Sequence, residues 1–228
     1  FNHRNFTGRS GTMFSYEGIG SIYWHMVSKL LLATQENYFF AKKQNLADQE
    51  LIRDLGNYYY QIRNGLSASK SPQEYGAFPF DPYSHTPSHS GAQQPGMTGQ
   101  VKEEILTRFG ELGCFINKGC ITFDTSLLRK EEFLTQKKTF VYFDVSTIKR
   151  NLDMNENQLA FTFCQIPIIY SLFKSDSYIN ILFSDNTNLE INGNLIDADK
   201  SSSIFNRDGM VKQVEFHVNE KFLFNNIN

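Results

Sequence analysis

Two carboxylates are the first candidates for chemistry in this sequence. Glu17 stands at the start of a predicted inner helix, and Asp81 lies between Pro79 and Pro82 in a long loop. A carboxylate can act as general base toward water in a hydrolysis, provided that a second group acts as acid. A glutamate in a first helical turn also stabilises the helix dipole, and an aspartate beside proline also stabilises a turn. Both residues are candidates for catalysis, with these structural roles as the alternative.

The segment from 75 to 99 combines stiff backbone with many polar side chains. It contains four prolines, each of which fixes its φ angle. A rigid backbone that carries converging donors and acceptors is what a preorganised sugar site needs. The alternative is an ordered surface loop held by its own hydrogen bonds. With the glycine-rich stretch before Glu17, this segment supplies the predicted substrate-binding residues: Arg9, Tyr16, Tyr83, His85, His89, Gln93, Gln94, Thr98 and Gly99.

These side chains differ in what they can do. Thr98-Gly99 precedes a predicted helix, whose free N–H groups suit an anion, although Thr98 can also serve only as a helix cap. Arg9 can clamp an anion or a sugar acid, and the tyrosines can stack on a sugar ring. His85 and His89 are four residues apart, but Pro87 between them argues against a helix, so we predict no metal site.

Helices are predicted to position these loops. Apolar residues at helical spacing indicate a buried inner helix from Tyr16 to Asn37 and an outer helix from Ala47 to Leu66, and a third helix begins near Gly99. The turn over 38–46 is short, whereas the loop over 67–98 is far longer than usual helix connections. This alternation is typical of the last helices of an (α/α)6 toroid, whose long loops meet at one end. We therefore expect a pocket there.

The pattern changes to short strands near residue 111. They are rich in Phe, Ile, Val and Tyr and are separated by turn residues such as Asn117-Lys118-Gly119. We predict an α + β protein in two parts, with the toroid end over 1–110 and an antiparallel β-sandwich over 111–228. The three cysteines fall in predicted strands, where burial is expected. The predicted strands are Cys114–Asn117, Gly119–Asp124, Thr139–Val145, Leu159–Cys164, Ile166–Phe173, Tyr178–Ser184, Asn188–Ile191 and Val211–Val218.

Bulk properties exclude several classes of function. The net charge of −2 gives no electrostatic footprint for nucleic acid. The longest apolar stretch, Ile22 to Ala33, contains His25, Ser28 and Lys29 and is too short to span a membrane. The sequence predicts no compartment and no oligomeric state. The chain does not begin with methionine, and we expect it to be a piece of a longer protein.

Three short motifs carry a resemblance to a known family. They are Gly11-Thr12-Met13-Phe14 before the inner helix, the segment 90–99 that ends in Thr98-Gly99, and Gly119-Cys120-Ile121-Thr122-Phe123 at the entry to the β part. Together with the order of elements over about 8–128, they resemble the C-terminal part of the cellobiose/chitobiose phosphorylase family and its relatives. Those proteins are α/α-toroid glycoside hydrolases and phosphorylases.

The resemblance implies a part of a carbohydrate-active enzyme that cleaves glycosidic bonds in an oligosaccharide or glycoside. In the family, Thr-Gly contacts phosphate, which here corresponds to Thr98-Gly99 and would make inorganic phosphate a co-substrate. The family's phosphorylases carry histidine after the first motif, where this chain has Ser15, Tyr16 and Glu17, which favours hydrolysis. The family's general acid lies in an earlier loop, so an upstream part of the same chain is the expected partner. No cofactor is implied. A non-catalytic saccharide-binding or structural module derived from such an enzyme is the alternative.

Overall fold

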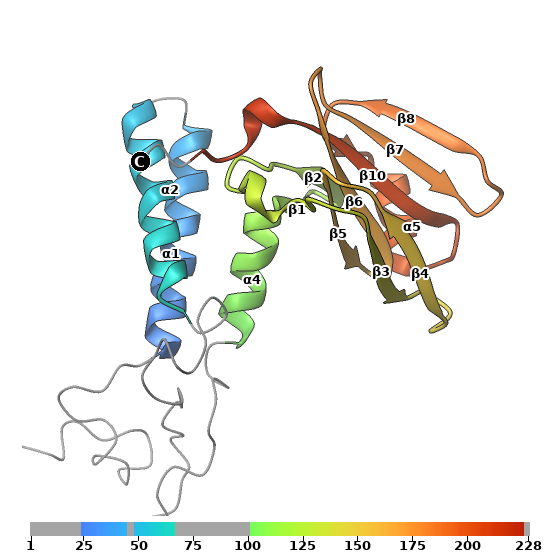
Figure 1. The fold of residues 1–228 in the computed structure, drawn as a ribbon, viewed down its shortest axis with the longest axis horizontal. Coiled ribbons are helices and arrows are strands. Elements are labelled where there is room, and N and C mark those ends of the chain that lie inside the picture. The colour runs from blue at the N-terminus through green and yellow to red at the C-terminus, as the bar shows by residue number, and fades with distance from the viewer. Residues whose placement is uncertain (1–23, 45–47, 67–100, 226–228) are drawn as a thin grey trace, which may run out of the picture. The chain divides into compact units, whose positions relative to one another are not determined.

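Helices come first and strands follow in the computed structural model, which describes residues 24–44, 48–66 and 101–225 (Figure 1). The protein is therefore α + β, as the sequence predicts. The described residues form two compact units that divide between Arg108 and Phe109. None of the helices described is long and apolar enough to cross a membrane.

The first unit contains a pair of helices, α1 (Trp24–Lys43) and α2 (Gln49–Asn64), joined by a short connection. Asp48 caps α2, because its side chain accepts a hydrogen bond from the backbone N–H of Glu50 at 3.0 Å. The two helices bury aromatic side chains, among them Tyr38 and Tyr59. The buried Gln35 of α1 donates from Nε2 to the backbone oxygen of Thr107 at 2.8 Å, which ties it to α4 (Val101–Leu112).

The sequence prediction for the first helix needs a correction at its C-terminal end. The inner helix was expected to end at Asn37, but α1 continues to Lys43, since Phe39 adds buried apolar surface beyond that point. Met26 and Leu30 of the same helix are 56% exposed within the chain, so its burial inside a larger helical assembly stays a prediction.

The second unit contains three sheets. A five-stranded sheet has the order β5-β6-β10-β7-β8, a three-stranded sheet the order β1-β2-β9, and β3 and β4 form a separate hairpin. The strands are β1 (Cys114–Asn117), β2 (Cys120–Phe123), β3 (Lys138–Phe143), β4 (Lys149–Met154), β5 (Gln158–Phe163), β6 (Ile166–Phe173), β7 (Tyr178–Phe183), β8 (Asn188–Asn192), β9 (Leu195–Ile196) and β10 (Val211–Asn219). Helix α5 (Ala198–Asn206) and the short 3-10 turns η3 (Lys130–Glu132) and η4 (Glu220–Phe222) complete the unit.

The five-stranded sheet is mixed, which corrects the prediction of an all-antiparallel domain. β10 pairs with β7 antiparallel but with β6 parallel, and Val214 lies beside Ile168 in that parallel register. A parallel pair needs a long crossover, and the chain between β6 and β10 supplies it through β7, β8, β9 and α5. Alternating residues along one strand show which face is buried but not the direction of its neighbour.

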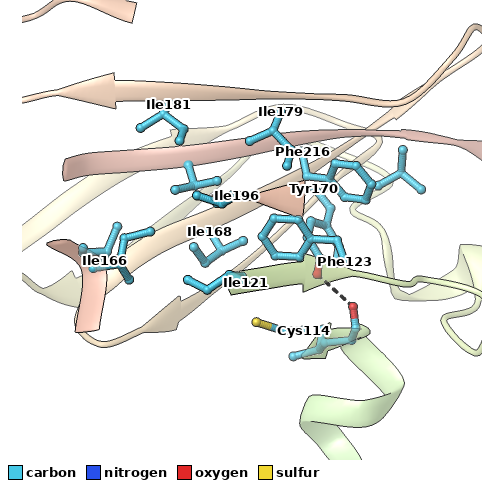
Figure 2. Packing of buried hydrophobic residues seen from close by; sticks show 14 of the residues in the cluster. Cys114, Ile121, Phe123, Ile166, Ile168, Tyr170, Ile179, Ile181, Ile196 and Phe216 are labelled. Carbon is cyan, nitrogen blue, oxygen red and sulfur yellow. Dashed lines mark hydrogen bonds between the residues drawn. The ribbon is translucent and has the colours of Figure 1, made fainter. Parts of the chain in front are cut away.

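One hydrophobic core lies between the five-stranded sheet and the elements opposite it (Figure 2). Ile121 and Phe123 of β2, Ile196 of β9 and Ile204 of α5 belong to the same buried cluster as the central strands β6, β7 and β10. The ring of Phe123 stacks on that of Phe216 with centroids 5.0 Å apart. Each fully buried side chain of this size stabilises the fold by about 1.5–3 kcal/mol.

The end of α4 is fixed to this core by one side chain and one glycine. Tyr170 of β6 is fully buried and donates its hydroxyl hydrogen to the backbone oxygen of Leu112 at 2.8 Å (Figure 2). Gly113 then takes a left-handed φ of +73°, and a Cβ there would lie 1.9 Å from the backbone oxygen of Asp124. Only glycine fits at this position.

Several elements of the second unit differ from the prediction. β4, β9 and α5 were not expected, and the segment between β2 and β3 contains η3 and buries Phe133. Cys164 was expected in a strand, but Cys164 and Gln165 form the two-residue turn between β5 and β6, with φ angles of 51° and 64°. Positive φ at both positions is the geometry of a tight hairpin turn, which usually contains Asn or Gly. All three cysteines are free, and only Cys114 is buried.

Candidate functional site

All the site residues predicted from the sequence lie outside the residues that the structure describes. They are Glu17 and Asp81 for catalysis and Arg9, Tyr16, Tyr83, His85, His89, Gln93, Gln94, Thr98 and Gly99 for substrate binding. Their convergence on one pocket therefore stays a prediction. The described residues offer a different candidate, on the second unit.

The five-stranded sheet has a polar side that faces away from its core. Along β10, Val214, Phe216 and Val218 belong to the core cluster, whereas Glu215 and His217 alternate with them. Side chains alternate between the two faces of a strand, so these two residues lie on the opposite face. We call this side the polar face. It carries the side chains of Gln158, Ser171, Phe173, Tyr178, Asn180, Glu190, Asn192, Gln213, Glu215 and His217.

The strand register sets these side chains in two rows across the sheet. The first row runs Gln158, Ser171, His217, Tyr178 and Asn192, one residue from each of the strands β5, β6, β10, β7 and β8. The second row runs Ala160, Ile169, Glu215, Asn180 and Glu190 over the same strands. Directly paired residues project from the same face, so each row spans about 19 Å at a strand spacing of about 4.8 Å. The β6 members of the two rows, Ser171 and Ile169, are buried, so a ligand would meet chiefly the residues of β10, β7 and β8.

Glu215 is held at the centre of the polar face by its neighbours. Ser171 donates from Oγ to Oε1 of Glu215 at 2.5 Å, and Gln158 donates from Nε2 to Oγ of Ser171 at 2.9 Å. Nε2 of His217 lies 3.7 Å from the same Oε1, and the Glu215 side chain keeps 23% of its exposure. Within the described part of the chain, no donor reaches the other oxygen, Oε2. A carboxylate oxygen in a fixed position is therefore available to a ligand.

Three rings form an aromatic group beside this carboxylate. The rings of Tyr178 and His217 stack with centroids 4.1 Å apart and planes 9° from parallel. Phe173 packs edge-on against both, with centroids at 5.5 Å from Tyr178 and 5.8 Å from His217. Burial raises the pKa of Tyr178, and the negative charges of Glu190 and Glu215 raise it further, so its hydroxyl stays protonated. The phenol can then donate one hydrogen bond.

This arrangement suits a neutral, hydroxyl-rich ligand. An aromatic ring has a negative face that attracts the C–H groups of a flat, apolar surface. The carboxylate accepts hydrogen bonds, and the side-chain amides of Asn180 and Asn192 both donate and accept them. In the residues that the structure describes, no group of three or more His, Cys, Asp or Glu is placed to hold a metal ion. The polar face therefore offers stacking and hydrogen bonding to a ligand.

The sequence contains the signal for this face, although our predicted site did not use it. The run Val214-Glu215-Phe216-His217-Val218 alternates strictly, and β7 alternates Tyr178, Asn180 and Leu182 with core residues. What the sequence lacks is the order of the strands, and it is this order that places Tyr178 beside His217. No protein-family model matches the chain, and no curated protein matches it significantly.

Proposed function

We propose that this chain is part of a carbohydrate-active protein that acts on glycosidic bonds, and that its polar face binds saccharide. The observation that carries the proposal is the Tyr178–His217 stack beside the fixed carboxylate of Glu215. A sugar ring presents C–H groups on one face and hydroxyl groups at its edge, which match the ring stack and the acceptor oxygen respectively. Tyr178 and His217 lie in the first row of the sheet, and Glu215 lies in the second row beside them.

We also propose a finer architecture for the two units. The short connection between α1 and α2 supports the last helices of an α/α-toroid, where inner and outer helices alternate. The core cluster, which combines residues of β2 and β9 with those of the five-stranded sheet, supports a sandwich-like second domain. In this arrangement Glu17 or Asp81 acts as general base, and an upstream part of the same chain supplies the acid.

Hydrolysis is our preferred reaction and phosphorolysis the rival. Full-length protein incubated with a panel of disaccharides, with and without inorganic phosphate, separates the two, because only phosphorolysis yields a sugar phosphate. Glu17→Gln or Asp81→Asn should abolish turnover if that residue is the base. Full turnover in both variants would remove these carboxylates from the mechanism.

A non-catalytic saccharide-binding module remains the second candidate, and one observation favours it. Glu215 is tied to Ser171 and has His217 beside it, so it is placed to accept hydrogen bonds from hydroxyl groups rather than to exchange protons. Binding without turnover in the full-length protein would support this reading.

Saccharide binding by the 228-residue chain tests the polar face directly. Isothermal titration with neutral oligosaccharides should give binding that Tyr178→Ala weakens by about ten-fold, the effect of losing about 1.4 kcal/mol of ring contact. Tyr58→Ala is the matched control, because Tyr58 is 56% exposed on α2 and belongs to the other unit. Equal loss in both variants, or no binding at all by the wild type, would refute the proposal.

A further inference from the structure

A cavity of about 500 Å³ lies in the second unit, apart from the aromatic group of the polar face. Its wall comes from three places: the β3–β4 hairpin, the tight turn at Gln165, and the first residues of β10. Its size falls within the range of sites that hold small organic molecules. The question is what chemistry its lining would recognise.

Several N–H groups of the lining side chains are left without an acceptor among the described residues. Arg150 uses Nε toward Asp144, but its two Nη nitrogens bond to no acceptor in the part of the chain that the structure describes. Lys212 has one long contact, 3.5 Å from Nζ to Oδ1 of Asn186. The half-buried Gln213 side chain makes no hydrogen bond to a described residue. Two cationic groups and an amide thus line one cavity with unused N–H groups.

The one carboxylate in the lining is already satisfied. Oδ1 of Asp144 accepts from the backbone N–H groups of Ser146 and Ile148 at 2.9 and 3.0 Å, and Oδ2 accepts from Nε of Arg150 at 2.6 Å. These bonds hold the turn between β3 and β4 and fix the guanidinium group. Asp144 therefore acts as a positioning residue for Arg150, and its charge is partly neutralised by that pair. With Lys212, the lining charges sum to one positive charge (two cations less one carboxylate).

The rest of the wall is mixed. Its apolar part comes from Leu152, Pro167, Val211, Val145 and Ile166, and Tyr142, Asn151, Gln165 and Ser184 add polar groups. Apolar surface beside convergent polar groups is common in small-molecule sites. A compact ring or branched body suits the wall, and an oxyanion suits the donors. A guanidinium group recognises carboxylate and phosphate in the same forked geometry.

We propose that this cavity binds a small organic anion, with a carboxylate or phosphate group on Arg150 and Lys212 and a compact apolar body against Leu152 and Pro167. The site adjoins the saccharide surface, since Gln213 of the polar face lines the cavity, but it binds its ligand through different side chains. Carboxylate and phosphate share the recognition chemistry, and the choice of probe distinguishes them.

The test uses the 228-residue chain and three ligands with the same ring: cyclohexanecarboxylate, cyclohexyl phosphate and neutral cyclohexanol. Amide chemical shifts in ¹H–¹⁵N spectra locate binding, because the cavity involves Gln165, Lys212 and Gln213, whereas the saccharide surface involves Tyr178. We expect one or both anions to shift the cavity amides and cyclohexanol to leave them unchanged. The anion that binds more tightly identifies the headgroup.

Variants then assign the donors. Arg150→Gln and Lys212→Gln should each raise the Kd of the preferred anion at least ten-fold. Lys212 is exposed, so its variant keeps the test valid if Arg150→Gln perturbs the hairpin. Lys149→Gln is the matched control, since it removes the same charge from the residue next to Arg150 and does not line the cavity. Equal loss in the control, equal binding of cyclohexanol, or no binding of either anion would overturn the proposal.

Discussion

Replacing Tyr170 with phenylalanine should destabilise the second unit through one hydrogen bond. The hydroxyl of Tyr170 donates to the backbone oxygen of Leu112 at 2.8 Å, and the side chain is fully buried. The carbonyl is one of the last in α4, so it has no partner inside the helix. Tyr170→Phe keeps the ring but leaves this acceptor buried without its donor. The expected cost is about 1–3 kcal/mol of unfolding free energy.

Urea unfolding followed by far-UV circular dichroism measures this free-energy cost. A loss of about 2 kcal/mol lowers the urea midpoint by about 1 M if the slope is about 2 kcal/mol per molar. Tyr142→Phe is the control, because the half-buried Tyr142 makes no hydrogen bond to a described residue through its hydroxyl, and the change should alter stability by less than about 0.5 kcal/mol. Equal midpoints for wild type and Tyr170→Phe would refute the capping role of Tyr170.

Stability at alkaline pH gives a second measurement of the contribution of Tyr170. Burial raises the pKa of Tyr170 well above the ordinary tyrosine value, and the charges of Cys114 and Asp124 raise it further. Because the folded state holds this proton more tightly, its contribution is fully present below the unfolded pKa and is lost as pH rises above about 10. Wild type should therefore lose stability above that pH, and Tyr170→Phe should lose less over the same range.

Three further predictions concern single positions of the second unit. Gly113→Ala should lower the unfolding free energy by more than about 2 kcal/mol, because it adds a clash with Asp124 to the left-handed backbone strain. Gly119→Ala meets no atom within 4 Å and should lower it only by the strain, about 1–2 kcal/mol. Chemical denaturation of both variants compares these losses. Burial raises the pKa of Cys114 to about 12, so iodoacetamide at pH 8 should leave it unmodified until the protein unfolds, as mass spectrometry would report. The hydrogen bond from Arg150 lowers the pKa of Asp144 below 3.8. The stability that Asp144 contributes is therefore present above pH 3.8 and is lost as pH falls through the lowered pKa. A carboxyl titration midpoint of Asp144 that does not rise in Arg150→Gln would contradict this.

The sequence predicts most strands of the second unit because one face of each is buried. β6, β7 and β10 are rich in β-branched and aromatic residues, and β1 and β2 flank a turn in which Lys118 and Gly119 both have positive φ. β4 was missed because its sequence from Lys149 to Met154 contains only two apolar residues. Those two, Leu152 and Met154, are its more buried positions, so the alternation is present but too short to predict a strand alone.

Helix α5 was missed for a related reason. It spans nine residues with three serines in its middle, and serine competes with the helix by bonding to nearby backbone. A local signal does exist, since Asp197 caps the helix by accepting from the backbone N–H of Lys200 at 3.0 Å. Burial of Ser201 and Ile204 then stabilises it against β2 and β10, which no local pattern reveals.

The candidate site shows more clearly that a local sequence pattern does not reveal contacts between distant segments. Residue types along β10 indicate that Glu215 and His217 share a face, but the ring partner of His217 comes from β7, some forty residues earlier. The cavity depends on still more distant parts, because Arg150 and Lys212 come together only when the β3–β4 hairpin lies over the start of β10. Pairings over such separations are set by the packed core, so spacing within one segment does not predict them.

The two proposed sites lie along one strand, and their charges allow a last test of their independence. Gln213 lines the cavity and Glu215 follows two residues later, about 6.8 Å along the strand, on the same face. At about 10 Å in water, the negative charge of Glu215 opposes a bound anion by about 0.4 kcal/mol, or about two-fold in Kd. Glu215→Gln should therefore tighten anion binding about two-fold at low salt, and the effect should vanish at high salt. The same substitution should weaken saccharide binding, because it replaces an acceptor of the polar face. If Glu215→Gln instead weakened the anion as much as Arg150→Gln does, the cavity and the polar face would form a single site, and the division between them would be wrong.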